Sequence, residues 1–203
     1  MDAFNLLKAD HRKVEKLFSQ LESASGQAKM RVFEQIKTEL ELHTHIEESI
    51  FYPALEKPKQ THDLTLEAYE EHDVVKKLLR ELSRAKTPNE EWEAKAKVLQ
   101  ENVEHHVEEE ENELFEKAEA ALSEEQIEAL GEKMEAEKER KQRGATKSSS
   151  KKKSAAANKS AAKSKSASTA PKRARASKKS GSKSRSKSPG SKRSKKSAKK
   201  SRR

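Results

Sequence analysis

The sequence predicts an all-α protein with an up-down-up-down four-helix bundle, a fifth helical segment and a disordered basic tail. Apolar residues recur at intervals of three and four along residues 1–143, which is the spacing of one helix face. Glycine and proline are scarce in this region and mark only short breaks. Because long helices joined by short connections pack as antiparallel neighbours, the expected architecture is a bundle.

Three breaks separate the four long helices. The breaks are "ASGQ" at 24–27, "PKQTH" at 58–62 and "KTPNEE" at 86–91. The helices expected around them span 3–23, 28–55, 62–85 and 89–120. The sequence therefore predicts one bundle domain over residues 1–122.

A fifth helical segment is expected over 123–143, where Ser123 and Gln126 have the spacing of a capping box. The remaining residues, 144–203, contain 18 serines and no Phe, Trp, Tyr, Leu, Ile or Val. A chain without large apolar side chains has nothing to bury against the entropy lost on ordering. The tail is therefore predicted to be disordered.

Charge divides the chain at the same place. Residues 144–203 contain 23 Lys and Arg and no Asp or Glu, which leaves 22 basic and 35 acidic residues in 1–143. The net charge of +10 thus combines a body of charge −13 with a tail of charge +23. Cysteine is absent, which excludes disulfides and thiolate sites. No apolar run approaches the roughly 18–20 residues of a membrane span, and the first residues lack the pattern of a secretory signal, so a cytoplasmic protein without a membrane partner is expected.

Each of the four apolar stripes includes one histidine, and two stripes include a glutamate one turn later. These polar stripe residues are His11, His43, Glu47, His72, His106 and Glu110. With turns centred near residues 26 and 88, the four histidines lie 15, 17, 16 and 18 residues from those turns. At a rise of about 1.5 Å per residue, all four imidazoles share one level of the bundle.

Two buried glutamates at this level need a compensating charge. Burying an ionised carboxylate without one costs several kcal/mol, and no Lys or Arg occupies the stripes nearby. Imidazole and carboxylate together suit iron, manganese or zinc, and two facing carboxylates that can bridge indicate two metal ions. The alternative is that the glutamates are protonated or paired with the histidines.

The segments "HTHIEESIFYPAL" from His43 and "HHVEEEENELF" from His105, with His11 and His72, resemble the hemerythrin-like (HHE cation-binding) family over about residues 1–140. The resemblance implies a hemerythrin-like bundle around a non-haem di-iron centre that binds or reacts with dioxygen or a related small molecule. The metal ligands that it implies are His11, His43, Glu47, His72, His106 and Glu110.

Two departures place the chain in the HHE branch rather than among the oxygen carriers. The oxygen carriers have a second histidine one turn after that of the third helix, where this chain has Lys76. Their last carboxylate is an aspartate five residues after its histidine, whereas Glu110 follows His106 by four. These departures argue against reversible oxygen transport. Fewer direct ligands leave open coordination positions, which favours reaction or sensing over inert storage.

Several residues beside the stripes are expected to lie outside the ligand set. These are His45, His62 and His105, the last of which forms an alternative pair with Glu109. Glu48 and Glu111 are candidates to hydrogen-bond ligating imidazoles, with surface exposure as the alternative. Tyr52 and Trp92 are expected to be packing residues.

The tail offers phosphate neutralisation but no aromatic platform for stacking and no scaffold for reading bases. Residues 169–200 resemble the tails of linker histones and of bacterial histone-like proteins. Non-specific binding of DNA or RNA through residues 144–203 is therefore expected. The alternative is a solubilising tail, or one that folds back on the acidic body.

Three functions compete at this point. The first is a metal-binding protein that binds or senses dioxygen, NO, peroxide or iron, tethered to nucleic acid in the nucleoid by its tail. The second is a di-iron oxidoreductase, peroxidase-like or repairing oxidised metal centres, whose tail only localises it. The third is a structural nucleoid protein with a degenerate site, against which stands the presence of all six implied ligands.

Overall fold

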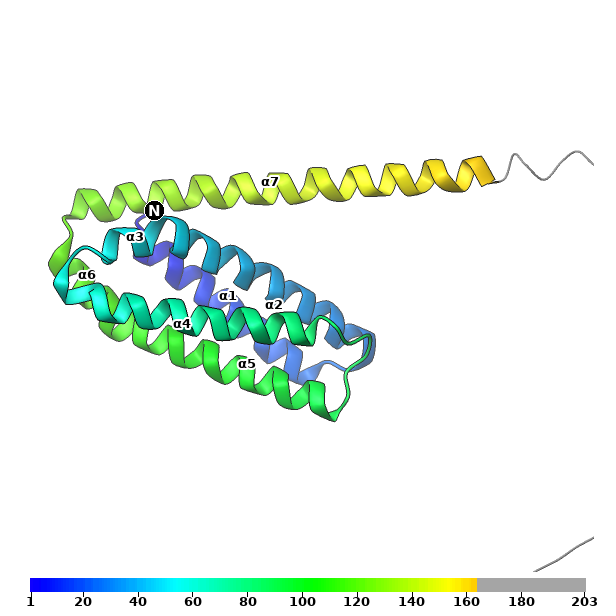
Figure 1. The fold of residues 1–203 in the computed structure, drawn as a ribbon, viewed down its shortest axis with the longest axis horizontal. Coiled ribbons are helices and arrows are strands. Elements are labelled where there is room, and N and C mark those ends of the chain that lie inside the picture. The colour runs from blue at the N-terminus through cyan, green and yellow to red at the C-terminus, as the bar shows by residue number, and fades with distance from the viewer. Residues whose placement is uncertain (164–203) are drawn as a thin grey trace, which may run out of the picture. The chain divides into compact units, whose positions relative to one another are not determined.

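The computed structural model describes the backbone of residues 1–163 and the side chains of residues 1–144, and all regular structure in that part of the chain is helical. Four long helices form the bundle (Figure 1). They are α1 (Ala3–Ser23), α2 (Gly26–Ile46), α4 (Lys59–Leu82) and α5 (Glu90–Glu109). Helix α1 packs against α2 and α4 against α5, and contacts of α1 with α5 and α2 with α4 close the bundle. The predicted all-α bundle is confirmed.

Local sequence accounts for where these helices begin. Asp2 caps α1 by accepting a hydrogen bond from the Asn5 N–H at 2.8 Å, and Asn89 caps α5 by accepting one from the Trp92 N–H at 2.8 Å. Gly26 has a φ of 53°, a left-handed conformation that glycine adopts without strain, and it allows the tight reversal between α1 and α2.

The second and fourth predicted helices each contain a π-helical turn that the sequence did not indicate. The segments are η1 (Glu47–Phe51) followed by α3 (Tyr52–Leu55), and η2 (Glu110–Leu114) followed by α6 (Phe115–Ala121). Each turn begins at a glutamate of the predicted ligand set. The helix accommodates one extra residue there, which shifts the buried face by one position.

The shift corrects the predicted apolar stripe. The sequence placed Ile50 and Ala54 on the buried face, but both are half-buried, while Tyr52 and Leu55 are fully buried. In the fourth helix the same shift buries Phe115 directly after Leu114. The extra residue in each π turn moves the buried positions that follow it by one, which is why the stripe deviates after each glutamate.

Two apolar clusters fill the bundle, one on either side of the histidine level. The cluster near the N-terminus includes Phe4, Phe51 and Phe115, and the other includes Phe18, Phe33 and Trp92. Each large side chain buried in this way stabilises the fold by about 1.5–3 kcal/mol. The polar level is therefore held between two close-packed regions.

Helix α7 (Glu124–Lys163) packs against the bundle through its first turns. The predicted capping box is present: the Ser123 N–H donates to the Gln126 side chain at 2.9 Å, and the Gln126 N–H donates to Ser123 Oγ at 3.3 Å. Leu130 and Met134 are buried in the cluster near the N-terminus. Between them, Gly131 lies so close to the start of α1 that a Cβ there would stand 2.7 Å from the Ala3 nitrogen.

The end of α7 differs from the prediction. The helical segment was expected to finish near Arg143, but the helix continues to Lys163. Residues 145–163 contain no proline, and their alanines and lysines favour helix. The predicted disorder of residues 164–203 lies outside the described residues.

Candidate metal centre

The six predicted ligand residues lie together in the core, at the level between the two apolar clusters. All are buried: His11, His43, Glu47, His72, His106 and Glu110 are each at most 6% exposed. The imidazoles form two pairs. The Nε2 atoms of His11 and His43 are 3.2 Å apart, as are those of His72 and His106. The structure therefore brings every predicted residue to one place.

The two glutamates lie between the histidine pairs. Glu47 places Oε1 3.2 Å from Nε2 of His43 and Oε2 3.4 Å from Nε2 of His72, so its two oxygens face different pairs. Glu110 places Oε2 3.3 Å from Nε2 of His11. Glu47 thus has the position of a bridging carboxylate.

The outward nitrogen of each imidazole faces a carboxylate. The distances from Nδ1 are 2.7 Å for His11 to Glu111, 3.0 Å for His72 to Glu48, 2.7 Å for His106 to Glu71 and 3.8 Å for His43 to Asp10. An Nδ1–H that donates to a carboxylate leaves the Nε2 lone pair free to bind a cation. Glu48 and Glu111 therefore hydrogen-bond two of these imidazoles, which was the alternative to simple surface exposure.

Sequence reasoning missed Asp10 and Glu71. Each directly precedes a stripe histidine, in "DH" at 10–11 and "EH" at 71–72, and this repeated acid–histidine step was the available signal. It also missed Lys138 of α7, which pairs with the buried Asp10. Burial alone would raise the pKa of Asp10, but the ion pair with Lys138 and the imidazole of His43 at 3.8 Å lower it, so this carboxylate is charged at neutral pH.

Burial and neighbouring charges shift the pKa values of several of these residues. Burial and the positive charge of neighbouring His11 lower the pKa of His43 to about 4, so that this imidazole is neutral at pH 7. Burial and the nearby negative charge of Glu110 raise the pKa of Glu47 well above its usual value. Burial acts in the same direction on Glu110, but the surrounding histidines lower its pKa to about 2.

Unpartnered buried oxygens test whether the residues fit a metal. Among the described residues, both carboxylate oxygens of Glu47 and Oε2 of Glu110 are buried without a hydrogen-bond partner. Such atoms are costly unless an ion compensates them. Two groups of ligand atoms, each within 4.8 Å of one another, share Glu47: His11, His43, Glu47 and Glu110 in one, and Glu47, His72 and His106 in the other. The arrangement fits two cations held by nitrogen and oxygen.

Tyr52 also reaches the centre, which corrects its prediction as a packing residue alone. Its hydroxyl lies 3.3 Å from Nε2 of His72 and donates to Oε1 of Glu110 at 3.4 Å. Burial, together with the carboxylates nearby, raises the pKa of Tyr52 well above its usual value, so the phenol keeps its proton. The π turn η1 brings the Tyr52 side chain to this position.

Trp92, by contrast, packs in the cluster that includes Phe18 and Phe33, and it donates its indole N–H to the Leu82 carbonyl at 3.2 Å.

A small apolar cavity adjoins the four histidines. Its volume is about 10 Å³, and Val14, Leu40, Val75 and Val103 are among its lining residues. A space this small holds at most one water-sized molecule. A groove of about 360 Å³ between α1 and α5 is lined by His11 and Glu111, so the centre has a side near solvent.

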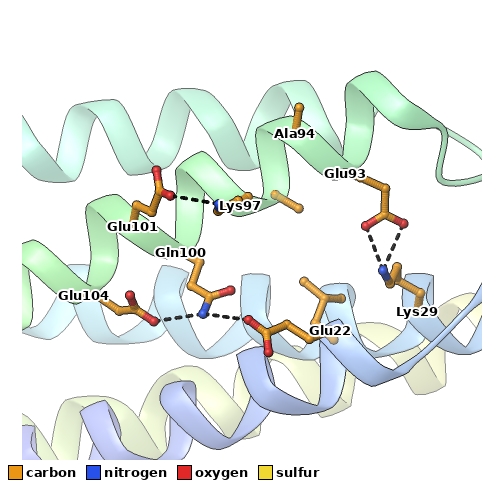
Figure 2. Close-up of a pocket in the computed structure, with 10 residues that line it drawn as sticks. Glu22, Lys29, Glu93, Ala94, Lys97, Gln100, Glu101 and Glu104 are labelled. Atoms are coloured by element: carbon orange, nitrogen blue, oxygen red, sulfur yellow. Dashed lines mark hydrogen bonds and ion pairs between the residues drawn. The ribbon is translucent and has the colours of Figure 1, made fainter.

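A larger surface hollow, about 530 Å³, lies elsewhere, between α5, α1 and the start of α2. Figure 2 shows that its two lysines are paired, Lys29 with both oxygens of Glu93 and Lys97 with Glu101. The side chain of Gln100 donates to Glu22 and Glu104. Paired charges are not available to a ligand. The buried histidine level is therefore the better candidate site.

The histidines predicted to be bystanders lie outside the buried level. His45 pairs with Glu137 of α7 at 2.7 Å, and His62 contacts the Glu56 carbonyl at 2.9 Å. His105 is 62% exposed and faces Glu109 at 3.5 Å. The predicted choice of His43 over His45 and of His106 over His105 agrees with their burial.

Comparisons with known proteins agree with this geometry. Residues 2–118 match the Hemerythrin family, described as the hemerythrin HHE cation binding domain. The fold is similar to the crystal structure of a hemerythrin HHE cation binding domain-containing protein from Mycobacterium kansasii, with a TM-score of 0.61 and 26% identity over 69% of this chain and 86% of that one.

A second relative is a longer protein than this chain. Over 139 residues the chain is 30% identical to a curated protein from Nostoc sp. named DNA nickase. The match covers 68% of this chain and 39% of that protein, so the chain spans less than half of its relative's length. Among the described helices, none is both long and apolar enough to cross a bilayer.

Proposed function

Because the chain belongs to the hemerythrin HHE cation-binding family, we propose that its bundle holds a non-haem dinuclear iron centre and that its basic tail tethers this centre to nucleic acid. The proposed ligands are His11, His43, Glu47, His72, His106 and Glu110. The observation that carries the proposal is Glu47, whose two unpartnered oxygens face different histidine pairs. One carboxylate shared in this way favours two ions over one.

The ligand types favour iron, while manganese and zinc accept the same nitrogen and oxygen donors. Bound iron would supply redox chemistry toward dioxygen, NO or peroxide. The chain's own residues would prepare the site for it. Outer carboxylates orient the imidazoles, apolar residues around the cavity limit entry to small molecules, and the Tyr52 hydroxyl holds a proton beside Glu110.

Tyr52 also favours a second candidate function. A proton donor whose hydroxyl lies 3.3 Å from the proposed ligand His72 suits turnover of peroxide as well as sensing. The oxidoreductase alternative therefore stands beside the binding role. Steady consumption of peroxide by the iron-loaded protein would favour the enzyme, while a single stoichiometric reaction would favour the sensor.

The tail is proposed to bind DNA or RNA without sequence preference. Residues 144–203 carry a charge of +23 with no aromatic side chain. The name of the Nostoc relative, DNA nickase, independently supports a connection to nucleic acid. Such binding would place the protein in the cytoplasm at the nucleoid.

Metal analysis of protein purified without chelators tests the metal proposal. We expect about two iron ions per chain after anaerobic loading, and ferric charge-transfer bands in the near ultraviolet once the loaded protein has been oxidised by air. Less than about half an equivalent of any transition metal would contradict it.

Gel shifts across a salt series test the tether. Full-length protein should bind duplex DNA with an affinity that falls steeply with salt, by a slope of roughly −0.9 per neutralised phosphate. Residues 1–143, with a charge of −13, should not bind. Sequence-selective binding that survives high salt would overturn the tether.

A further inference from the structure

A third cluster of metal-binding side chains lies on the outer surface of α4 and α5, next to the buried centre. Glu71, His105 and Glu109 each offer one ligand atom, and these atoms all lie within 4.8 Å of one another. His105 and Glu109 are four residues apart on α5 and therefore share a helix face. Their side chains are 62% and 33% exposed, so the cluster faces solvent.

We propose that this cluster is a labile binding site for a divalent transition metal, through which the buried centre is loaded. The Nε2 atom of His105 lies 3.5 Å from Oε1 of Glu109 and 3.8 Å from Oε1 of Glu71. Ligands about 2.1 Å from a tetrahedral ion stand about 3.4 Å from one another. A small closure of the side chains would therefore complete three protein ligands, and water would take the remaining position.

The charges around the cluster support a cation there. Glutamates elsewhere on the same surface pair with lysines, such as Glu101 with Lys97 and Glu113 with Lys117. Among the described residues, no lysine or arginine pairs with Glu71 or Glu109. Two carboxylates that converge on one imidazole, with no lysine or arginine partner among the described residues, favour an ion that binds nitrogen and oxygen, such as Fe²⁺, Mn²⁺ or Zn²⁺.

Glu71 connects this outer cluster to the centre. Its Oε2 accepts a hydrogen bond from Nδ1 of His106 at 2.7 Å, while its Oε1 faces His105. The same carboxylate therefore orients a buried imidazole and contributes to the surface site. An ion held at the surface would stand next to the helix face that carries His106. The loading role rests on the proposed function, whereas the surface site itself does not.

The competing interpretation is that His105 forms only an ion pair with the two glutamates. A titration of full-length protein with Zn²⁺, after its buried centre has been filled with iron, separates the two. We expect one further equivalent that a weak chelator removes, with a shift of the His105 imidazole signals in the NMR spectrum. No further equivalent and no shift would establish the ion pair and overturn the surface site.

Substitutions locate the site. His105→Ala and Glu109→Gln should weaken binding of the further equivalent by about tenfold or more, since even residues outside the ligand shell change metal affinity by about 10–100-fold. Glu113→Gln is the matched control, because Glu113 lies one turn further along and is paired with Lys117. A further equivalent that survives both substitutions would contradict this assignment.

Loading kinetics test the role. Both variants should fill the buried centre with Fe²⁺ several-fold more slowly than the Glu113→Gln control, yet reach the same final iron content. Equal loading rates would remove the loading role. Absence of tightly bound iron from every protein, the parent included, would instead contradict the proposed function, so the two failures are distinguishable.

Discussion

The two helical hairpins of the bundle contribute the same parts to the centre in the same order. In α1–α2 and in α4–α5, the first helix carries an acid followed by a histidine, and the second carries a histidine, then a glutamate four residues later, then another glutamate. These parts are Asp10, His11, His43, Glu47 and Glu48 in one hairpin, and Glu71, His72, His106, Glu110 and Glu111 in the other. The second glutamate reaches across to the opposite hairpin, where Glu48 binds His72 and Glu111 binds His11.

The hairpins differ at two positions, and the differences concern reactivity rather than ligand supply. Five residues after its glutamate, one hairpin has Tyr52 and the other has Phe115. Behind the second-helix histidine, Glu71 stands 2.7 Å from His106, whereas Asp10 stands 3.8 Å from His43 and pairs with Lys138 of α7. The residues that the two hairpins share form the candidate cation site, and the residues in which they differ distinguish the side near His43 from the side near His106.

The largest expected effect separates the two bridging candidates. Glu47 belongs to both groups of ligand atoms and Glu110 to one. Glu47→Ala should therefore abolish tight binding of both ions. Glu110→Ala should leave about one ion bound, because the group of Glu47, His72 and His106 keeps its three ligands. Iron content after anaerobic loading measures this. Equal losses would mean that the two glutamates are equivalent.

Off-register substitutions are the controls for that comparison. Glu109→Ala and His45→Ala should leave both tightly bound ions in place, because these side chains lie outside the buried level. A loss of tight binding in either variant would show that the ligand register is wrong by one or two residues.

The next effect compares the carboxylates behind the imidazoles. Glu71→Ala should weaken tight metal binding by about 10–100-fold, as is usual for groups that orient a ligating histidine. Asp10→Ala should have the smaller effect, because its carboxylate is 3.8 Å from His43 and already engaged by Lys138. Competition with a chelator of known affinity gives both values. A larger effect at Asp10 would reverse the assignment.

Among the described residues, Lys138 of α7 pairs with Asp10, and no residue of α7 pairs with Glu71. Gly131 tests how α7 packs against the bundle. An added Cβ at Gly131 would meet backbone atoms of Asp2 and Ala3, so Gly131→Ala should destabilise the protein by about 1–3 kcal/mol in urea unfolding. Gly144→Ala is the matched control, because nothing lies within 4 Å of a Cβ there. If both variants unfolded at the same urea concentration, α7 would not be packed as described.

The smallest effect on stability is expected from Tyr52→Phe, which makes the two hairpins alike. Its hydroxyl contacts are 3.3 and 3.4 Å long, so their loss should cost at most about 1 kcal/mol and leave the tight metal content unchanged. The absorption spectrum of the iron-loaded protein and its rate of reaction with peroxide should change. Tyr69→Phe, which loses a surface hydrogen bond to Glu56, should change neither.

The helical period was sufficient to predict that the six polar stripe residues lie together in the core. It succeeded because His43 and His106 precede the π turns and Glu47 and Glu110 are the first residues of these turns, so the stripe is still regular at all four positions. It failed at Tyr52, which lies after one. A π turn depends on a shift in backbone hydrogen bonding that no residue type marks, so its position followed from the structure alone.

Other misses have a different origin. Asp10, Glu71 and Lys138 act through contacts between helices, and a stripe analysis considers each helix separately. The end of α7 was missed because the argument for disorder considered burial and not the helix propensity of alanine and lysine. The expected charge division remains visible in the sequence itself, since it depends only on residue counts.

The π turns also determine how readily this site can change over evolutionary time. Each turn amounts to one inserted residue between a glutamate and the aromatic side chain that follows it. Deleting the exposed Ser49 would restore α-helical spacing and rotate Tyr52 by about 100° around the helix axis, while the preceding His43 and Glu47 would keep their register. A single codon therefore separates a lineage with a phenol at its metal centre from one without, and the ligands need not change.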